Sequence, residues 1–403
     1  MEIRTVGRDF LGDIHSILAE SLPHDRFSAA LLHEKLFDNP RPDTDLYHTF
    51  GAFDRNRLTG FMQSVRRGDR AWLGLFAVDP AFRRRGVASA LFERVQETWP
   101  GATDVEVLAL PGNYFAPGLD PRYTAALGFL ERRGFERFKD CVNMTVDLTG
   151  PFVTRLTTDD FTVRRATAED APRLDEFFTR HFGEDWRFEV QRAQRALPVG
   201  LHVALSGERV VAFAAHSSQN REWGFFGPMG TAPEAEGHGL GRVLLHRCLA
   251  DLYAAGHGRA VIPWVGPISF YARHCGARVD RVFWRYRRAA GVRLEGDRLL
   301  EGGETAVLTV AGRWTGATPC PVDRAIQRHV ARGVHRVVID GSRLEAIGDA
   351  APGQATAWGG RLREAGGFLC FVRVPPPLHT AMELAGVLTT AVIRETLADA
   401  QTL

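Results

Sequence analysis

Hydrophobic residues along the chain alternate between short runs of strand length and longer stretches with helical spacing. From Ala71 to Val78 the sequence AWLGLFAV is almost continuously apolar, which predicts a buried strand. After it, apolar residues recur at helical spacing at Val87, Leu91 and Val95, which predicts an amphipathic helix. A strand, a tight turn and a helix are therefore expected in direct succession.

The turn between this strand and helix carries three consecutive arginines, Arg83, Arg84 and Arg85, followed by Gly86. The first turn of a helix leaves backbone N–H groups unpaired, and these groups attract an anion such as a phosphate. Arginines beside the positive end of a helix are unfavourable on their own. A bound polyphosphate would offset that repulsion, although a solvated arginine cluster would give the same pattern.

The same pattern recurs in the second half of the chain. TAPEAEGHGLGRVLL, from Thr231 to Leu245, aligns without a gap with VDPAFRRRGVASALF, from Val78 to Phe92. The strand-like run WGFFGPMG precedes the second stretch, and an apolar-periodic helix follows it. A repeated strand–turn–helix unit is therefore expected.

The ends of the two copies correspond as well. MEIRTVGRDFLGDIHSIL and FTVRRATAEDAPRLDEFF each predict a short strand followed by a helix. FLERRGFERF and FYARHCGARV each predict a helix that closes on glycine before a strand. We expect two copies of one domain, over residues 1–150 and 160–288, joined by the polar segment TRLTTDD.

RRRGVA, from Arg83 to Ala88, resembles the [Q/R]-x-x-G-x-[G/A] motif of the GNAT acetyltransferases, and the preceding VDP is typical of that family. The resemblance implies an α/β (α+β) fold, with a mixed, mostly antiparallel sheet flanked by helices in each copy. It also implies acetyl-CoA as cosubstrate and an amine as acetyl acceptor. The implied cofactor-binding residues are Phe76, Val78, Arg83, Arg84, Arg85, Gly86, Val87 and Ala88 in the first copy, and Met229, Thr231, Gly237, His238, Gly239, Leu240 and Gly241 in the second.

The copies differ at positions that matter for this chemistry. In the second copy Glu236 stands where the family has Arg or Gln, and its carboxylate would oppose pyrophosphate binding. In the first copy Leu130 stands where many members carry a tyrosine, whereas the second copy has Tyr271. A phenol with a pKa near 10 can protonate the departing CoA thiolate. Tyr271 is therefore the expected general acid, with a half-buried structural tyrosine as the alternative.

Two further residues of the second copy are weighed for proton transfer. Glu222 precedes the strand WGFFG and is a candidate general base for the attacking amine, although an acid ahead of a strand is commonly solvated. His238 lies inside the phosphate loop, where it serves better as a spacer or phosphate contact than as a base.

The first copy contains an extra segment, PGNYFAPGLDPRY, from Pro111 to Tyr123. It lies where GNAT proteins admit their acceptor, so it could shape a pocket in which Tyr114 or Tyr123 replaces the missing acid. It could equally make a contact between the two copies, and the sequence leaves both interpretations open.

Beyond about residue 290, strand-like and helical stretches alternate, which predicts a third, α/β layer. The segment from 300 to 403 resembles a STAS domain, which implies a docking or regulatory module with a protein partner. Asp349 and Ala350 stand where such domains often carry a phosphorylatable serine. We therefore expect no phosphorylation at this position.

Composition limits the remaining function classes. The formal net charge is +2, which predicts neither a nucleic-acid nor a membrane partner. The five cysteines are scattered without a CxxC pair, which predicts free thiols, no metal site and a reducing, cytoplasmic location. Two functions remain: an N-acetyltransferase acting on a small-molecule amine or a protein lysine, and a non-catalytic acyl-CoA sensor or scaffold.

Overall fold

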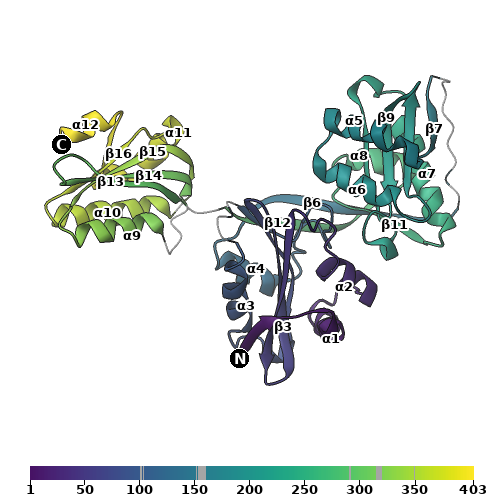
Figure 1. Cartoon of the computed structure of the whole chain (residues 1–403), viewed down its shortest axis with the longest axis horizontal. Helices are drawn as coiled ribbons and strands as arrows, with labels where there is room; N and C mark the ends of the chain where they lie inside the picture. Colours follow the sequence, from purple (N-terminus) through teal and green to yellow (C-terminus); the bar gives the residue numbers. More distant parts are fainter. Residues whose placement is uncertain are drawn as a thin grey trace. The chain divides into compact units, whose positions relative to one another are not determined.

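The computed structural model describes residues 1–99, 102, 104–150, 152, 160–289, 292–314, 320–348 and 350–403. Most of the linker TRLTTDD and Asp349 lie outside the described residues. The chain forms two compact units, Met1–Arg287 and Arg288–Leu403, and both copies of the repeat belong to the first unit (Figure 1).

The first copy is built on a mixed, mostly antiparallel sheet, in which β4 and β5 pair in parallel, with helices on both faces. The strand and the helix predicted around the arginine turn are both present, as β4 and α3. Apolar residues of α3 are buried against β2, β3 and β4, which fixes the turn at the edge of the sheet. The main elements are β1 Glu2–Thr5, α1 Leu11–Ser21, α2 Ala29–Leu36, β2 Asp45–Asp54, β3 Arg57–Arg67, β4 Arg70–Val78, α3 Val87–Gln96, β5 Asp104–Val107, α4 Thr124–Glu131 and β6 Glu136–Asp147.

The second copy repeats this order of elements, as its sequence predicts. A short strand and two helices precede three antiparallel strands, and the glycine turn again leads from a strand into a long helix. The elements are β7 Thr162–Arg165, α5 Ala171–His181, α6 Glu184–Gln194, β8 Leu201–Ser206, β9 Arg209–His216, β10 Phe226–Thr231, α7 Leu240–Ala254, β11 Arg259–Ile262, α8 Ile268–Cys275 and β12 Arg278–Ala289.

The two copies exchange their last strands. The sheet order of the first copy runs β1-β2-β3-β4-β5-β12-β6-β11, so β12 of the second copy lies beside β5 of the first. In turn β6 of the first copy pairs antiparallel with β12 and with β11 of the second. The sheet of each copy is therefore completed by a strand of the other.

The second unit has the βα alternation that the sequence predicts, with parallel pairing from β14 onward. Along β14, Ala306, Leu308 and Val310 face the core made with α9 and α10, whereas Val307 faces the core on the other side with α12. Its elements are β13 Arg293–Leu299, β14 Thr305–Trp314, α9 Pro321–Val330, β15 Arg336–Ile347, α10 Ala351–Glu364, β16 Phe368–Val372, α11 Pro376–Leu384, β17 Val392–Arg394 and α12 Leu397–Gln401.

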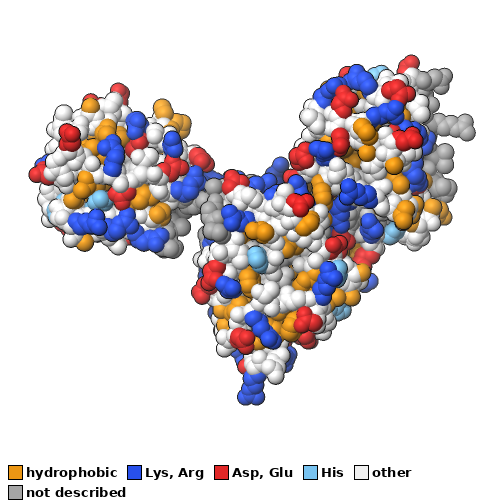
Figure 2. All heavy atoms as spheres, viewed as in Figure 1, with side chains coloured by type: hydrophobic (Ala, Val, Ile, Leu, Met, Phe, Trp, Pro, Cys, Tyr) orange, Lys and Arg blue, Asp and Glu red, His pale blue; other side chains and the backbone are white. Residues whose placement is uncertain are grey.

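The surface of each unit mixes both signs of charge. On the faces drawn in Figure 2, arginine and acidic side chains are interspersed with hydrophobic ones, in keeping with the net charge of +2. Across the described residues, every helix is too short or too polar to cross a bilayer.

Candidate active site

The turns before α3 and α7 have the same backbone geometry. Arg83 and Glu236 are both extended, with φ −63° and ψ 157° in the first and φ −66° and ψ 157° in the second. Gly86 and Gly239, which cap the two helices, are both left-handed, with φ of 81° and 74°. The ungapped sequence repeat is therefore a repeat of backbone conformation.

The second turn adopts this geometry with less strain than the first. Arg84 has a φ of +63°, and the matching residue of the second turn is Gly237, with a φ of +82°. A side chain in this region costs roughly 1–2 kcal/mol that glycine avoids. A Cβ added at Gly237 or Gly239 would meet no atom within 4 Å, so the space in front of this turn is open.

The second turn borders a cavity of about 1350 Å³. Strands β10 and β11 touch at the bridge between Phe225 and Val261, and the cavity lies beyond that point, between β10 and the residues that follow β11. Seven residues predicted from the sequence for the second copy line this cavity. His238 is not among them, and its Nδ1 lies 2.9 Å from the carbonyl oxygen of Glu236. The seven are Met229, Thr231, Gly237, Gly239, Leu240, Gly241 and Tyr271.

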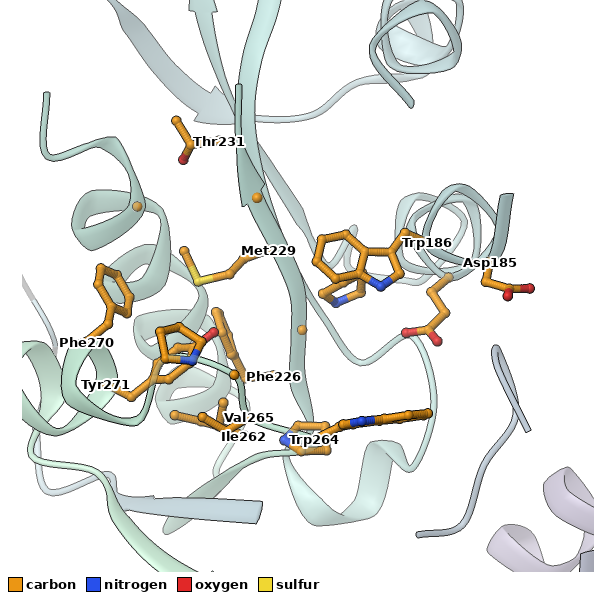
Figure 3. A pocket seen from close by; sticks show the side chains of 18 of the residues that line it. Asp185, Trp186, Phe226, Met229, Thr231, Ile262, Trp264, Val265, Phe270 and Tyr271 are labelled. Atoms are coloured by element: carbon orange, nitrogen blue, oxygen red, sulfur yellow. The ribbon is translucent and has the colours of Figure 1, made fainter. Parts of the chain in front are cut away.

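Tyr271 on α8 stands inside the cavity wall. Its ring packs edge-on against Phe270 and Phe226, with ring centroids 5.2 and 6.1 Å away. Figure 3 shows the ring among these aromatic side chains, on the same side of the cavity as Met229. Burial raises the pKa of Tyr271, so the phenol stays protonated across the neutral range. Among the described residues, no group is hydrogen-bonded to its hydroxyl.

A cationic side chain lines the same cavity as Glu236. Glu236 lines the cavity, as does Arg242 in the first turn of α7. The Nε of Arg242 is buried and has no hydrogen-bond partner within the described part of the chain. The family motif has a cationic residue before the glycines, whereas Arg242 follows them in the sequence.

The turn of the first copy lies outside the large cavity. Arg83 to Ala88 do not line the large cavity, and the Nε of Arg83 donates to the carbonyl of Val78 at 3.3 Å. Val87 is a core residue, with Val78 and Ala88 packed against the same core. Phe76 borders a cavity of only about 50 Å³, enough for one or two waters at about 30 Å³ each.

The extra segment of the first copy contributes both to its cores and to the large cavity. Phe115 and Leu119 from this segment are buried in the two cores of the first copy. Tyr123 donates to Asp25 at 2.5 Å beside the small cavity. Tyr114 instead lines the large cavity of the second copy, where its ring lies 5.6 Å from that of Trp264. The segment therefore both shapes a pocket and joins the two copies.

The structure places Glu222 outside the cavity. This exposed carboxylate accepts a hydrogen bond from the hydroxyl of Ser28, the residue that caps α2. Its position gives it no access to Tyr271 through the cavity lining.

A different carboxylate lines the cavity, that of Glu189 on α6. Its side chain is 8 % exposed and accepts the backbone N–H of Gly112 at 3.1 Å. Burial raises the pKa of Glu189 to about 7, against the opposing effects of the Gly112 bond, Arg192 and Lys35. Sequence reasoning missed this residue, although a glutamate on the same helical face as Ala193 was a usable signal.

The family comparisons agree with this arrangement. Residues 45–137 match the acetyltransferase (GNAT) domain, residues 164–277 match the acetyltransferase (GNAT) family, and residues 298–394 match the Mlab, STAS domain. The chain combines two GNAT domains with a STAS domain. No curated protein matches it. Among the described residues, no group of three or more His, Cys, Asp or Glu is placed to hold a metal.

Solved structures share the fold of the tandem GNAT region. The GCN5-related glucosamine N-acetyltransferase region of a fungal GH3 beta-N-acetylglucosaminidase has a TM-score of 0.60 and 17% identity; the match covers 71% of this chain and 38% of that one. A GCN5-related N-acetyltransferase from Sphaerobacter thermophilus has a TM-score of 0.56 and 16% identity, with coverage of 72% and 95%. A tandem GNAT protein from the clavulanic acid biosynthesis pathway has a TM-score of 0.56 and 15% identity, with coverage of 72% and 98%. The expected fold class is confirmed.

Proposed function

We propose that this protein is an acetyl-CoA-dependent N-acetyltransferase whose second GNAT domain carries the reaction. The observation that supports this most is the cavity itself, because one continuous space joins the glycine turn, Tyr271 and Glu189. Its volume exceeds the roughly 300–1,000 Å³ typical of a single small-ligand site. A cosubstrate and an acceptor could therefore lie in it together, which direct transfer requires.

The turn before α7 suits the pyrophosphate of acetyl-CoA. The backbone from Gly237 to Gly241 is open in front, and the N–H groups of the first turn of α7 are free of helical partners. The helix dipole and Arg242 add positive potential at this end of the cavity. Among the residues expected to bind the cosubstrate, those of the second copy are therefore the ones we assign to it.

In the proposed reaction the acceptor nitrogen attacks the thioester carbonyl, a C–N bond forms and the C–S bond breaks. Glu189 takes a proton from the amine, directly or through one water, and Tyr271 gives its phenolic proton to the departing sulfur. Solvent then restores the phenol and carries away the proton held by Glu189. The base role moves from Glu222 to Glu189 because only the latter lines the cavity.

The remaining domains receive supporting roles in this proposal. The first GNAT domain contributes Tyr114 to the wall of the active cavity. The STAS domain serves as a docking or regulatory module for a protein partner, since it forms a compact unit with its own cores.

Calorimetric titration of acetyl-CoA into the full chain tests the assignment of the cosubstrate. In Gly239→Asp, affinity should fall more than tenfold, because a side chain and a negative charge enter the phosphate site. Gly86→Asp is the matched control, since both glycines are left-handed helix caps with open space in front. It should change affinity less than twofold.

If Gly86→Asp weakened binding more than Gly239→Asp, the site would lie in the first domain. If neither variant lost affinity, the acetyl-CoA proposal would be wrong. Tight binding without transfer to any amine would instead identify the protein as an acyl-CoA sensor.

A further inference from the structure

The end of the cavity away from the glycine turn has a lining of mixed chemistry. Aromatic rings of Tyr114, Trp186 and Trp264 face it together with the carboxylates of Asp185 and Glu189. Figure 3 shows Trp186 and Asp185 on the side of the cavity opposite Phe270 and Tyr271. Arginines also line this end: Arg41, Arg67 and Arg70.

The arginines of this end are already neutralised by the protein. Arg67 binds both oxygens of Asp45, at 2.7 and 2.8 Å. Arg41 and Arg67 share Oδ1 of Asp185, at 3.0 and 2.8 Å. Arg70 donates to Glu106 at 3.2 Å. Arg41 and Arg67 therefore hold α6 against the first copy. All three arginines are paired with carboxylates, so they leave little positive potential for an anionic ligand.

Glu189 is the carboxylate of this end that lacks such a partner. In the described part of the chain, no cationic side chain lies within ion-pair distance of it, and its one hydrogen bond comes from the backbone of Gly112. The charges of Arg192 and Lys35 oppose the effect of burial on Glu189 but do not overcome it. A buried carboxylate without a direct ion pair is costly, and a cationic ligand would relieve that cost.

Trp186 provides the aromatic partner for such a cation. It lies three residues before Glu189 on α6, so the two side chains are neighbours on one helical face. One face of the indole stacks on Phe182, with centroids 5.0 Å apart and planes at 13°. The side chain is 39 % exposed, and it borders the cavity. A ring that is supported on one face and accessible beside a carboxylate suits an organic cation.

We propose that the acceptor binds as an alkylammonium cation between the Trp186 ring and the Glu189 carboxylate, so that the enzyme selects cationic aliphatic amines over amines bearing a nearby anionic group. That the bound cation is the acetyl acceptor rests on the proposed function, whereas cation binding at this site does not. Glu189 then both attracts the ammonium group and removes its proton, whereas Trp186 acts only in recognition.

Choline and its uncharged isostere 3,3-dimethylbutan-1-ol test the site without any turnover, because neither carries an amine to acetylate. In ligand-observed NMR titrations of the full chain, choline should bind roughly three- to thirtyfold more tightly than the alcohol. Trp186→Leu should abolish the preference, and Trp186→Phe, which keeps an aromatic face, should retain part of it. Glu189→Gln should weaken choline and leave the alcohol unchanged.

Equal binding of choline and the alcohol to the wild-type chain would overturn the inference, as would a choline preference that survives Trp186→Leu. Transfer assays separate its failure from that of the proposed function. If acidic amino acids are acetylated as efficiently as simple alkylamines, the proposed cation site is wrong but the proposed acetyltransferase activity is supported. If choline binds as expected but no amine is acetylated, the proposed cation site is supported and the proposed acetyltransferase activity is wrong. Circular dichroism of each variant checks that it is folded.

Discussion

At the scale of single residues, the two groups of the cavity that we assign to proton transfer have pKa values shifted in the directions that this transfer needs. Burial brings the pKa of Glu189 to about 7, where a base is half ionised at neutral pH and still has useful basicity. Burial moves the pKa of Tyr271 upward, so the acid remains protonated. Burial is the main cause of both shifts.

The pH dependence of kcat/KM should follow the ionisation of the Glu189 carboxyl group. Activity requires the ionised carboxylate, so it should be low in acid, rise through pH about 7 and level off above it. Glu189→Gln should lower kcat by about 10²–10⁴-fold and remove that inflection. Glu222→Gln is the matched control and should leave both kcat and the inflection in the pH profile unchanged. The groups that act on Glu189 from its surroundings are Lys35, Gly112, Asp185 and Arg192.

Tyr271→Phe keeps the packing of the ring and removes only the proton. We expect kcat to fall by about 10²–10⁴-fold while acetyl-CoA affinity stays within twofold. Because burial raises the pKa of Tyr271, no alkaline fall in activity from this phenol is expected below pH 9. A fully active Tyr271→Phe together with an inactive Tyr123→Phe would place the chemistry in the first domain.

The sequence predicted the glycine turn and Tyr271 because both rest on local features, a strand–turn–helix and a helical position. It could not predict the shifted pKa of Glu189, because that shift depends on burial and on contacts with Gly112 and Lys35 of the first copy. Nor could it predict that Tyr114 crosses to the cavity of the other copy. Contacts between residues far apart in the chain decide both.

At the scale of elements, a buried ionic cluster joins β8, β9 and α7. Asp251 of α7 accepts hydrogen bonds from His202 at 2.7 Å, from His216 at 3.2 Å and from Arg165 at 2.6 Å. His202 and His216 are each 4 % exposed. The cluster therefore clamps the helix that follows the glycine turn onto the central strands of its sheet.

Stability should depend on pH through this cluster. Burial lowers the pKa of His202, so the unfolded chain takes up a proton more readily than the folded one. The contribution of His202 is fully present above its unfolded pKa of about 6.5 and declines as the pH falls below that value. Denaturant titrations at several pH values should show the free energy of unfolding decreasing between pH 6.5 and 5.

His202→Gln provides the comparison, because it keeps a polar side chain and loses the titrating group. The variant should be less stable at pH 7.5 and should show a shallower decrease on acidification. An unchanged pH slope would show that other groups cause it.

Helices and strands were predicted better than their pairing. The strand over β14 and the helix over α9 follow directly from hydrophobic spacing and from Pro321 at the helix start. Nothing in the sequence indicates that β6 and β12 change places, because both are ordinary terminal strands of their copies. Register between distant strands depends on tertiary packing, which local spacing does not contain.

At the scale of the whole molecule, the exchanged strands make the two GNAT domains interdependent. Residues 1–150 alone would leave β5 without its neighbour β12, and would leave β6 without β11 and β12. Unpaired edges of this kind promote aggregation. We expect 1–150 expressed alone to be insoluble, and to become soluble and co-purify when expressed with 160–403.

The full chain, expressed in parallel, is the reference for yield and for the unfolding transition. A soluble fragment 1–150 that unfolds cooperatively as a monomer would contradict the exchange.

The exchange also determines when the protein can finish folding on the ribosome. The first sheet cannot complete its strand pairing until β12 has been synthesised. β12 ends at Ala289, whereas β6 ends at Asp147. At about 5–20 residues per second, the roughly 140 intervening residues take about 7–28 s to synthesise. During that interval the edges of β5 and β6 stay open in the nascent chain. Translation speed across the second domain, and chaperones that cover strand edges, should therefore govern the yield of native protein.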